Sequence, residues 1–128
     1  MATVGVGVDI VDVERFAVAM TRHPRIVERL FTDQERLDAR SRPERLAARF
    51  AAKEAVLKTL QCGVGAAPWR SIEVRKAPNG APSILLHEPA AQLARRHGVT
   101  SLHVSLSHTE LSAVAFVVGS GPEVSRAG

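Results

Sequence analysis

The sequence is poor in aromatic residues, in cysteine and in long apolar runs. It contains no Tyr, one Trp and four Phe, so aromatic residues make up 4% of its 128 residues. Without such rings the chain lacks stacking platforms for single-stranded nucleic acid, and we expect no nucleic-acid partner. Cys62 is the only cysteine, which excludes an internal disulfide and a cysteine-based zinc site. No apolar run approaches 18 residues and no signal peptide is recognisable, so we expect a cytoplasmic protein without a membrane partner.

The chain is instead rich in arginine. Lys and Arg together number 17, and only Lys53, Lys58 and Lys76 are lysines, which leaves 14 Arg and a net charge of +4. Arginine favours two-pronged contacts with carboxylates and phosphates. An acidic protein, a polyphosphate ligand or nucleic acid would each suit this balance. The length indicates one domain, whose core must be built mainly from Val, Leu, Ile and Ala.

Hydrophobic periodicity and turn signals predict a single α+β domain with a mainly antiparallel sheet packed against a long helix. Strands are expected at residues 4–11, 71–76, 82–87, 102–107 and 111–118, with Asn79-Gly80 as a hairpin turn. Helices are expected at 12–30 with a break near Pro24, after Phe31, at 43–61 and at 89–97. Two capping boxes, Thr32 with Glu35 and Ser41 with Glu44, are expected to begin the second and third of these helices. The domain thus spans residues 1–118, and 119–128 is expected to be a flexible tail.

The first strand places a carboxylate beside two glycines. Because side chains alternate along a strand, Gly5, Gly7 and Asp9 share one face and the valines between them share the other. Asp9 therefore lies on a face that the glycines leave open. The alternative is that Asp9 caps the helix that follows.

The helix around residues 49–58 combines charged and apolar residues. Glu54 and Lys58 are four residues apart and share one helix face, and Arg49 and Lys53 form a neighbouring row. The simplest alternative is an exposed ion pair of little energetic weight. A carboxylate flanked by cations can instead bind a divalent metal while the cations bind phosphates.

Asp9 and Glu54 together would suit Mg²⁺, which binds one or two protein carboxylates along with water and phosphate oxygens. Zinc bound by His108 with His103 or His87 is the weaker alternative, because the spacing is poor and carboxylates suit a harder metal. A serine hydrolase is also disfavoured, because no nucleophile-elbow motif accompanies the serines near His108.

The chain resembles the small 4′-phosphopantetheinyl transferases of the holo-acyl-carrier-protein synthase family. The matching segments are residues 5–10 with 14–16, residues 31–35, residues 49–58, residues 79–82 and residues 103–109. Each segment is weak evidence alone, but they occur in the family's order and spacing over residues 4–118.

The resemblance implies transfer of 4′-phosphopantetheine from coenzyme A to a serine of an apo acyl carrier protein, with release of 3′,5′-ADP. It implies Mg²⁺ bound by Asp9 and Glu54, with Glu54 as a candidate base and Lys58 stabilising the reacting oxygens. Coenzyme A would be held by Arg49, Lys53, Lys58, Gly63, Pro82, His108 and Thr109. The resemblance also implies a homotrimer with sites between subunits, and docking of the acidic carrier on the helix with Arg15 and Arg22. The carrier would serve fatty acid or polyketide synthesis.

Two rival functions remain open from the residues alone. One is a basic, non-catalytic module that binds nucleic acid or an acidic protein, supported by the arginine count. The other is a different Mg²⁺-dependent nucleotide enzyme that uses the same carboxylate pair.

Overall fold

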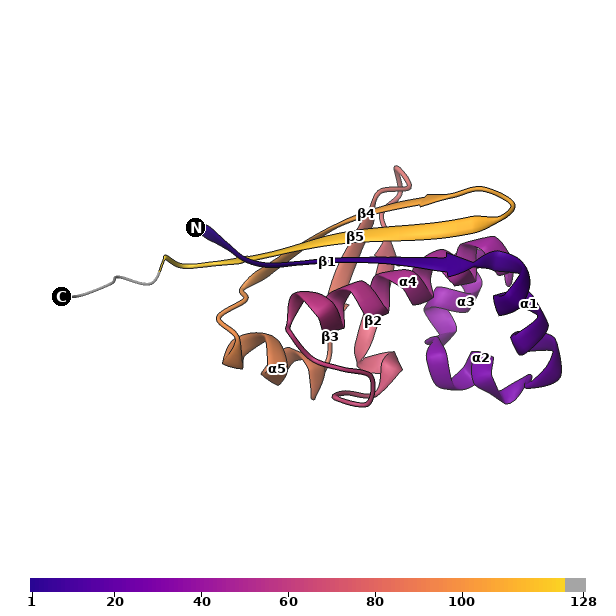
Figure 1. Cartoon of the computed structure of the whole chain (residues 1–128), viewed down its shortest axis with the longest axis horizontal. Coiled ribbons are helices and arrows are strands. Elements are labelled where there is room, and N and C mark those ends of the chain that lie inside the picture. The colour runs from indigo at the N-terminus through magenta and orange to yellow at the C-terminus, as the bar shows by residue number, and fades with distance from the viewer. Residues whose placement is uncertain (124–128) are drawn as a thin grey trace.

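The computed structural model describes residues 1–123 of the chain (Figure 1). Its elements in order are β1 (Ala2–Asp12), α1 (Val13–Arg22), α2 (Arg25–Leu30), α3 (Asp33–Ala39), α4 (Pro43–Thr59), the 3₁₀ turn η1 (Trp69–Ser71), β2 (Ile72–Lys76), β3 (Pro82–Leu86), α5 (Ala90–Arg96), β4 (Ser101–His108) and β5 (Ser112–Gly121). The predicted α+β class and long helix are confirmed. No helix in residues 1–123 is both long and apolar enough to cross a bilayer.

The antiparallel strands form two sheets rather than one. Strands β1, β5 and β4 lie in that order in a three-stranded sheet, and β2 pairs with β3 in a hairpin. The last strand, β5, runs to Gly121, so residues 119–121 belong to the sheet and not to the predicted tail. Residues 124–128 of that tail lie outside the described residues.

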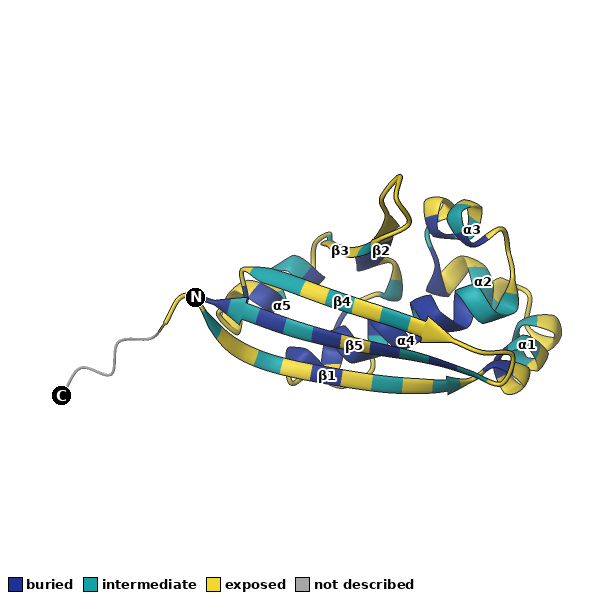
Figure 2. Cartoon of the chain, turned by 90° about the horizontal axis from the view of Figure 1, so that it is seen from above, coloured by how far each residue is buried: buried dark blue, intermediate teal, exposed yellow. Residues whose placement is uncertain are grey.

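Helix α4 runs along the inner face of the three-stranded sheet (Figures 1 and 2). Glycines on β1 permit a very close approach: a Cβ on Gly5 would lie 2.3 Å from the carbonyl oxygen of Thr59, and one on Gly7 would lie 2.0 Å from that of Ala55. The glycine face predicted to be open is therefore covered by α4 along much of its length. Asp9 lies on this inner face, paired with Ala115.

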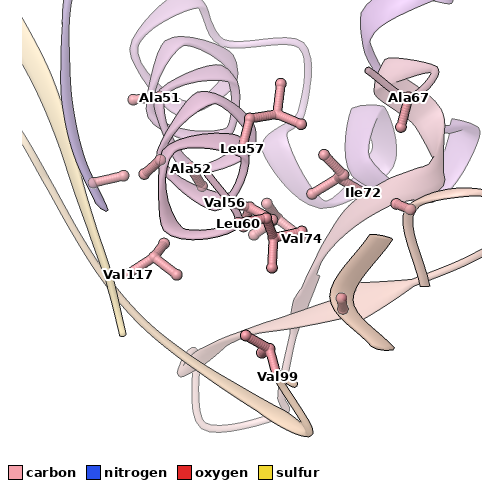
Figure 3. Packing of buried hydrophobic residues seen from close by; sticks show 14 residues of the cluster. Ala51, Ala52, Val56, Leu57, Leu60, Ala67, Ile72, Val74, Val99 and Val117 are labelled. Atoms are coloured by element: carbon pink, nitrogen blue, oxygen red, sulfur yellow. The ribbon is translucent and has the colours of Figure 1, made fainter. Parts of the chain in front are cut away.

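Buried aliphatic residues fill the space between α4, the sheet and the hairpin (Figure 3). A second cluster around Phe16, Phe31 and Leu46 joins the small helices to the first half of α4. Phe50 and Trp69 pack against this cluster, so most of the sparse aromatic rings of the chain are gathered at this end of the molecule.

The outer face of β1 is apolar and exposed. Val6, Val8 and Ile10 are 56%, 53% and 68% exposed, and Phe116 of the neighbouring β5 is 47% exposed. Figure 2 shows exposed and less exposed residues alternating as coloured bands along β1. A row of this kind on a sheet is typical of a surface that another protein covers.

The predicted helix caps have different outcomes. The capping box of Thr32 and Glu35 at α3 is confirmed. The one assigned to Ser41 and Glu44 is wrong, because α4 begins after Arg42, whose side chain makes no capping hydrogen bond. The connection turns there through Ser41 with a left-handed φ of 52°.

Candidate active site

The structure brings Asp9, Glu54 and Lys58 together from two elements. Asp9 lies on β1 where that strand crosses α4, and Glu54 and Lys58 lie one turn apart on the facing side of α4. The Lys58 ammonium donates hydrogen bonds to the Asp9 carboxylate at 3.0 Å and to the Val8 carbonyl at 2.9 Å. These contacts join the helix to the strand at the site. Asp9 does not cap α1, because Asp12 accepts the hydrogen bond from the Arg15 backbone N–H there.

The two carboxylates create an excess of negative charge in a partly buried place. Burial is the main cause that raises the pKa of Glu54, the adjacent Asp9 carboxyl adds to the rise and Lys58 opposes it, and the resulting pKa is about 7. The Oδ2 atom of Asp9 is buried and has no hydrogen-bond partner.

A divalent cation such as Mg²⁺ prefers oxygen ligands, would neutralise the crowded negative charge and would give the buried Asp9 oxygen a partner. Residues 1–123 contain no group of three or more His, Cys, Asp or Glu side chains arranged around a common metal position. The residues present therefore fit a cation held by two carboxylates, with its other positions left for water and substrate.

An open pocket of about 470 Å³ lies over this pair, lined in part by Arg15, Phe16 and Phe50. The Phe16 and Phe50 rings are stacked with centroids 5.5 Å apart. Neither ring was predicted to belong to the site. The spacing of Phe50, four residues before Glu54 and so on the same helix face, could have indicated it.

Lys53 was predicted to hold nucleotide phosphates, and the structure contradicts this. Its side chain is fully buried, and its ammonium donates to Glu35 at 2.7 Å and to the carbonyls of Trp69 and Ile72 at 3.0 and 2.7 Å. An ammonium has three protons, and all three are used within the protein. Lys53 directly precedes Glu54 on the helix, so its side chain points about 100° away from that of Glu54 and enters the core.

Arg49 is also buried, and burial lowers the pKa of its guanidinium. It donates to the Arg45 carbonyl at 3.1 Å, while its Nε atom has no partner. The structure does not place it on the carboxylate pocket. Its role as a phosphate ligand stays a prediction.

The other predicted coenzyme A ligands lie apart from the carboxylates within one chain. Gly63 follows the end of α4, and Pro82 begins β3. His108 ends β4, and with Thr109 it lines a separate pocket of about 530 Å³ together with Glu44 and Glu110. Arg15 and Arg22 lie on one side of α1 and line a pocket of about 380 Å³, so Arg15 borders both that pocket and the carboxylates.

Comparison with known proteins places this arrangement in a family. The family model described as the 4′-phosphopantetheinyl transferase superfamily matches residues 5–115. The chain belongs to this superfamily. The predicted family and enzyme class are thereby confirmed, which removes support for a non-catalytic basic module.

The relatives are more specific. The holo-[acyl-carrier-protein] synthase of Frankia alni is 51% identical over 121 residues, which cover 92% of this chain and 98% of that protein. The crystal structure of the Helicobacter pylori holo-[acyl-carrier-protein] synthase in complex with coenzyme A has a TM-score of 0.82 and 32% identity, covering 90% of this chain and 99% of that one. A Bacillus anthracis holo-(acyl-carrier-protein) synthase in complex with CoA (3′,5′-ADP) has a TM-score of 0.76 and 31% identity, covering 94% and 98%.

Proposed function

We propose that this protein transfers 4′-phosphopantetheine from coenzyme A to a serine of an apo acyl carrier protein and releases 3′,5′-ADP. The observation that carries the proposal is the convergence of Asp9 and Glu54, from β1 and α4, under one open pocket, with the Lys58 ammonium bound to Asp9. Relatives with the same fold bind coenzyme A or 3′,5′-ADP. The activity is that of relatives about half identical to this chain over nearly its whole length.

In this reaction the serine oxygen attacks the β-phosphorus of the coenzyme A pyrophosphate, and the bond to the departing 3′,5′-ADP oxygen breaks. Asp9 and Glu54 would hold Mg²⁺, which would supply charge neutralisation and Lewis-acid chemistry at the pyrophosphate. Glu54 is the proposed acceptor of the serine hydroxyl proton, because its carboxylate lines the pocket over the reacting group and is placed to take that proton directly or through a bound water.

Lys58 has two tasks in this scheme. Its hydrogen bonds to Asp9 and to the Val8 carbonyl fix the position of the Asp9 carboxylate. The Lys58 side chain is 55% exposed, so its ammonium can also reach the phosphate oxygens on which charge grows as the bond breaks. Catalysis thus depends on positioning and charge neutralisation rather than on a covalent enzyme intermediate.

We further propose that the active form is a homotrimer. The exposed apolar face of β1 supports this, because such a face in water favours association. The distribution of the predicted ligands supports it as well. Strand β5 separates Asp9 on β1 from His108 on β4. A coenzyme A molecule that contacts both the carboxylate pair and the His108 side of the sheet is therefore more readily bound between subunits.

The acidic carrier is proposed to dock on α1, where Arg15 and Arg22 flank a pocket. Arg15 also borders the carboxylate pocket, so docking there delivers the carrier serine next to the reacting phosphate. Whether the carrier serves fatty acid or polyketide synthesis stays open, and a cytoplasmic location stays a prediction from the sequence.

The test incubates the protein with coenzyme A, Mg²⁺ and several apo carrier proteins, and measures the mass of each carrier. We expect one carrier to gain the mass of phosphopantetheine in an EDTA-sensitive reaction. Glu54→Gln should abolish the gain, while Glu88→Gln, which changes an exposed carboxylate remote from the site, should not. Unmodified carriers throughout would overturn the proposal.

A further inference from the structure

The contact between α4 and β1 is very close. On the strand it is made by Gly5 and Gly7, and on the helix by the backbone carbonyls of Ala55 and Thr59 together with the Thr59 side chain, which lies against both glycines. Packed elements usually hold their relative position because ridges of side chains fit into grooves. On this side of α4 the Thr59 side chain fits between the strand glycines, and Lys58 adds hydrogen bonds to Val8 and Asp9.

The opposite side of α4 carries a polar anchor. The Lys53 ammonium is held by the Glu35 carboxylate of α3 and by the carbonyls of Trp69 and Ile72 before and at the start of β2. These three acceptors come from different segments and surround one atom of the helix. A side chain bound in this way resists both sliding and rotation of α4.

Glu35 is itself fixed in place. Its Oε1 atom also accepts the Thr32 backbone N–H at 2.9 Å, and its Oε2 atom accepts the Val74 N–H at 3.0 Å. Both Lys53 and Glu35 are fully buried. A buried ion pair is poor evidence for stability, because apolar side chains of similar volume often serve as well. Its distinctive property is that only one arrangement of α3, α4 and β2 satisfies all of its hydrogen bonds.

We propose that Lys53 is a positioning residue: with Glu35 it sets the rotation and rise of α4 so that Glu54, the next residue, faces Asp9 at the distance that a shared cation requires. This inference rests on the proposed function. Lys53 touches neither substrate nor cation in this role. Lys58 provides the second anchor, on the β1 side, through its hydrogen bonds to Val8 and Asp9. The proposed metal-binding carboxylates thus lie between these hydrogen bonds and the buried ion pair of Lys53 with Glu35.

The experiment uses the full chain with Lys53→Met combined with Glu35→Gln, which removes both buried charges and keeps side-chain length. Three quantities are measured at a temperature where circular dichroism shows the variant folded: kcat, KM for coenzyme A, and Mn²⁺ affinity without substrates by electron paramagnetic resonance. We expect kcat and Mn²⁺ affinity each to fall at least about 10-fold, which is the lower end of the loss typical when a residue that orients metal ligands is removed. KM for coenzyme A should stay within about twofold, because Lys53 binds no phosphate.

A matched control separates positioning from general loss of stability. Val117→Ala removes fully buried volume from the core on β5 and leaves the ion pair intact. It should lower the melting temperature while kcat and Mn²⁺ affinity in the folded protein stay within about twofold of wild type. An equal loss of kcat and Mn²⁺ affinity in this control would show that any destabilisation disturbs the site, and would overturn the inference.

The remaining outcomes are equally decisive. Unchanged kcat and Mn²⁺ affinity in the folded double variant would overturn the inference, and so would a KM for coenzyme A raised more than about 10-fold, which would make Lys53 a phosphate ligand. If the double variant does not fold, Glu35→Asp, which keeps both buried charges and shortens the reach of the carboxylate, should show a partial loss of kcat and Mn²⁺ affinity, and no loss would refute the proposal. Failure of the wild-type protein to modify any carrier defeats the proposed function instead, and the Mn²⁺ measurement still tests the positioning role.

Discussion

Replacing Glu54 with Gln should make the metal-free protein more stable at alkaline pH. Burial and the neighbouring Asp9 raise the pKa of Glu54 from 4.5 to about 7 in the folded protein. The folded state therefore binds this proton more tightly than the unfolded state does. As pH rises from 4.5, the unfolded chain loses its proton first, so stability falls and the full penalty is present above about pH 7.

The size of the penalty follows from the same pKa values. One pKa unit corresponds to about 1.4 kcal/mol, so the rise sets an upper limit of about 3 kcal/mol. Glu54 remains half-buried, and solvent screens its interactions, which reduces the expected gain to about 1–2 kcal/mol. With an unfolding entropy of about 2.1 cal/mol/K per residue, this gain raises the melting temperature by about 4–7 °C.

The assay is thermal unfolding of wild type and Glu54→Gln in EDTA at pH 8 and at pH 5. The variant should melt higher at pH 8, and the difference should shrink towards pH 5, where folded Glu54 is protonated. Glu88→Gln serves as the control for loss of an exposed carboxylate. Adding Mg²⁺ at pH 8 should raise the melting temperature of wild type only, because the cation stabilises the state that binds it.

Two results would refute this reasoning. A Glu54→Gln protein that melts below wild type at pH 8 in EDTA would mean that the carboxylate is stabilising and not crowded. A difference between the two proteins that does not change with pH would mean that the titration of Glu54 is not its cause.

Three further predictions concern packing, docking and assembly. Gly7→Ala should lower stability by about 2 kcal/mol and the melting temperature by about 7 °C, because the added Cβ would collide with the α4 backbone. Gly63→Ala, with nothing within 4 Å of the added Cβ, should change little, and equal melting temperatures of the two variants would contradict this prediction. Arg15→Glu should raise KM for the carrier protein at least about 10-fold with a smaller effect on KM for coenzyme A, while Arg96→Glu on the exposed side of α5 should alter neither, and an unchanged carrier KM would remove α1 from the docking surface. Val8→Asp should convert the proposed trimer to monomers in sedimentation analysis, and a trimer that survives this change would show that the outer face of β1 is not the interface.

Much of this architecture could be predicted from the sequence. The alternation in β1, the Asn79-Gly80 turn and the Thr32 capping box each have a local physical cause, and all three are observed. The proximity of Asp9 to Glu54 was also predicted, although the two residues lie 45 positions apart. It followed from the assumption that the first strand packs beside the long helix.

The errors arose where the surroundings of a residue decide its role. Lys53 has the composition and spacing of a phosphate ligand, but α3 and β2 cover its side of α4 and supply acceptors from distant segments. Local sequence contains no information about that cover. The orientation of β1 posed a similar problem, because its valines lie on the outer face and its glycines on the inner one. Close approach of a helix backbone outweighs the usual burial of aliphatic side chains there.

The direct junction of β1 and α1 has a consequence for substrate delivery. Asp12 ends the strand and caps the helix at the same residue, so no linker separates the proposed metal ligand Asp9 from the proposed docking residue Arg15. The two positions belong to one rigid corner and cannot move independently. A carrier seated on the helix as proposed would place its serine beside the reacting phosphorus, so the same few residues would control both selectivity among carriers and the rate of transfer.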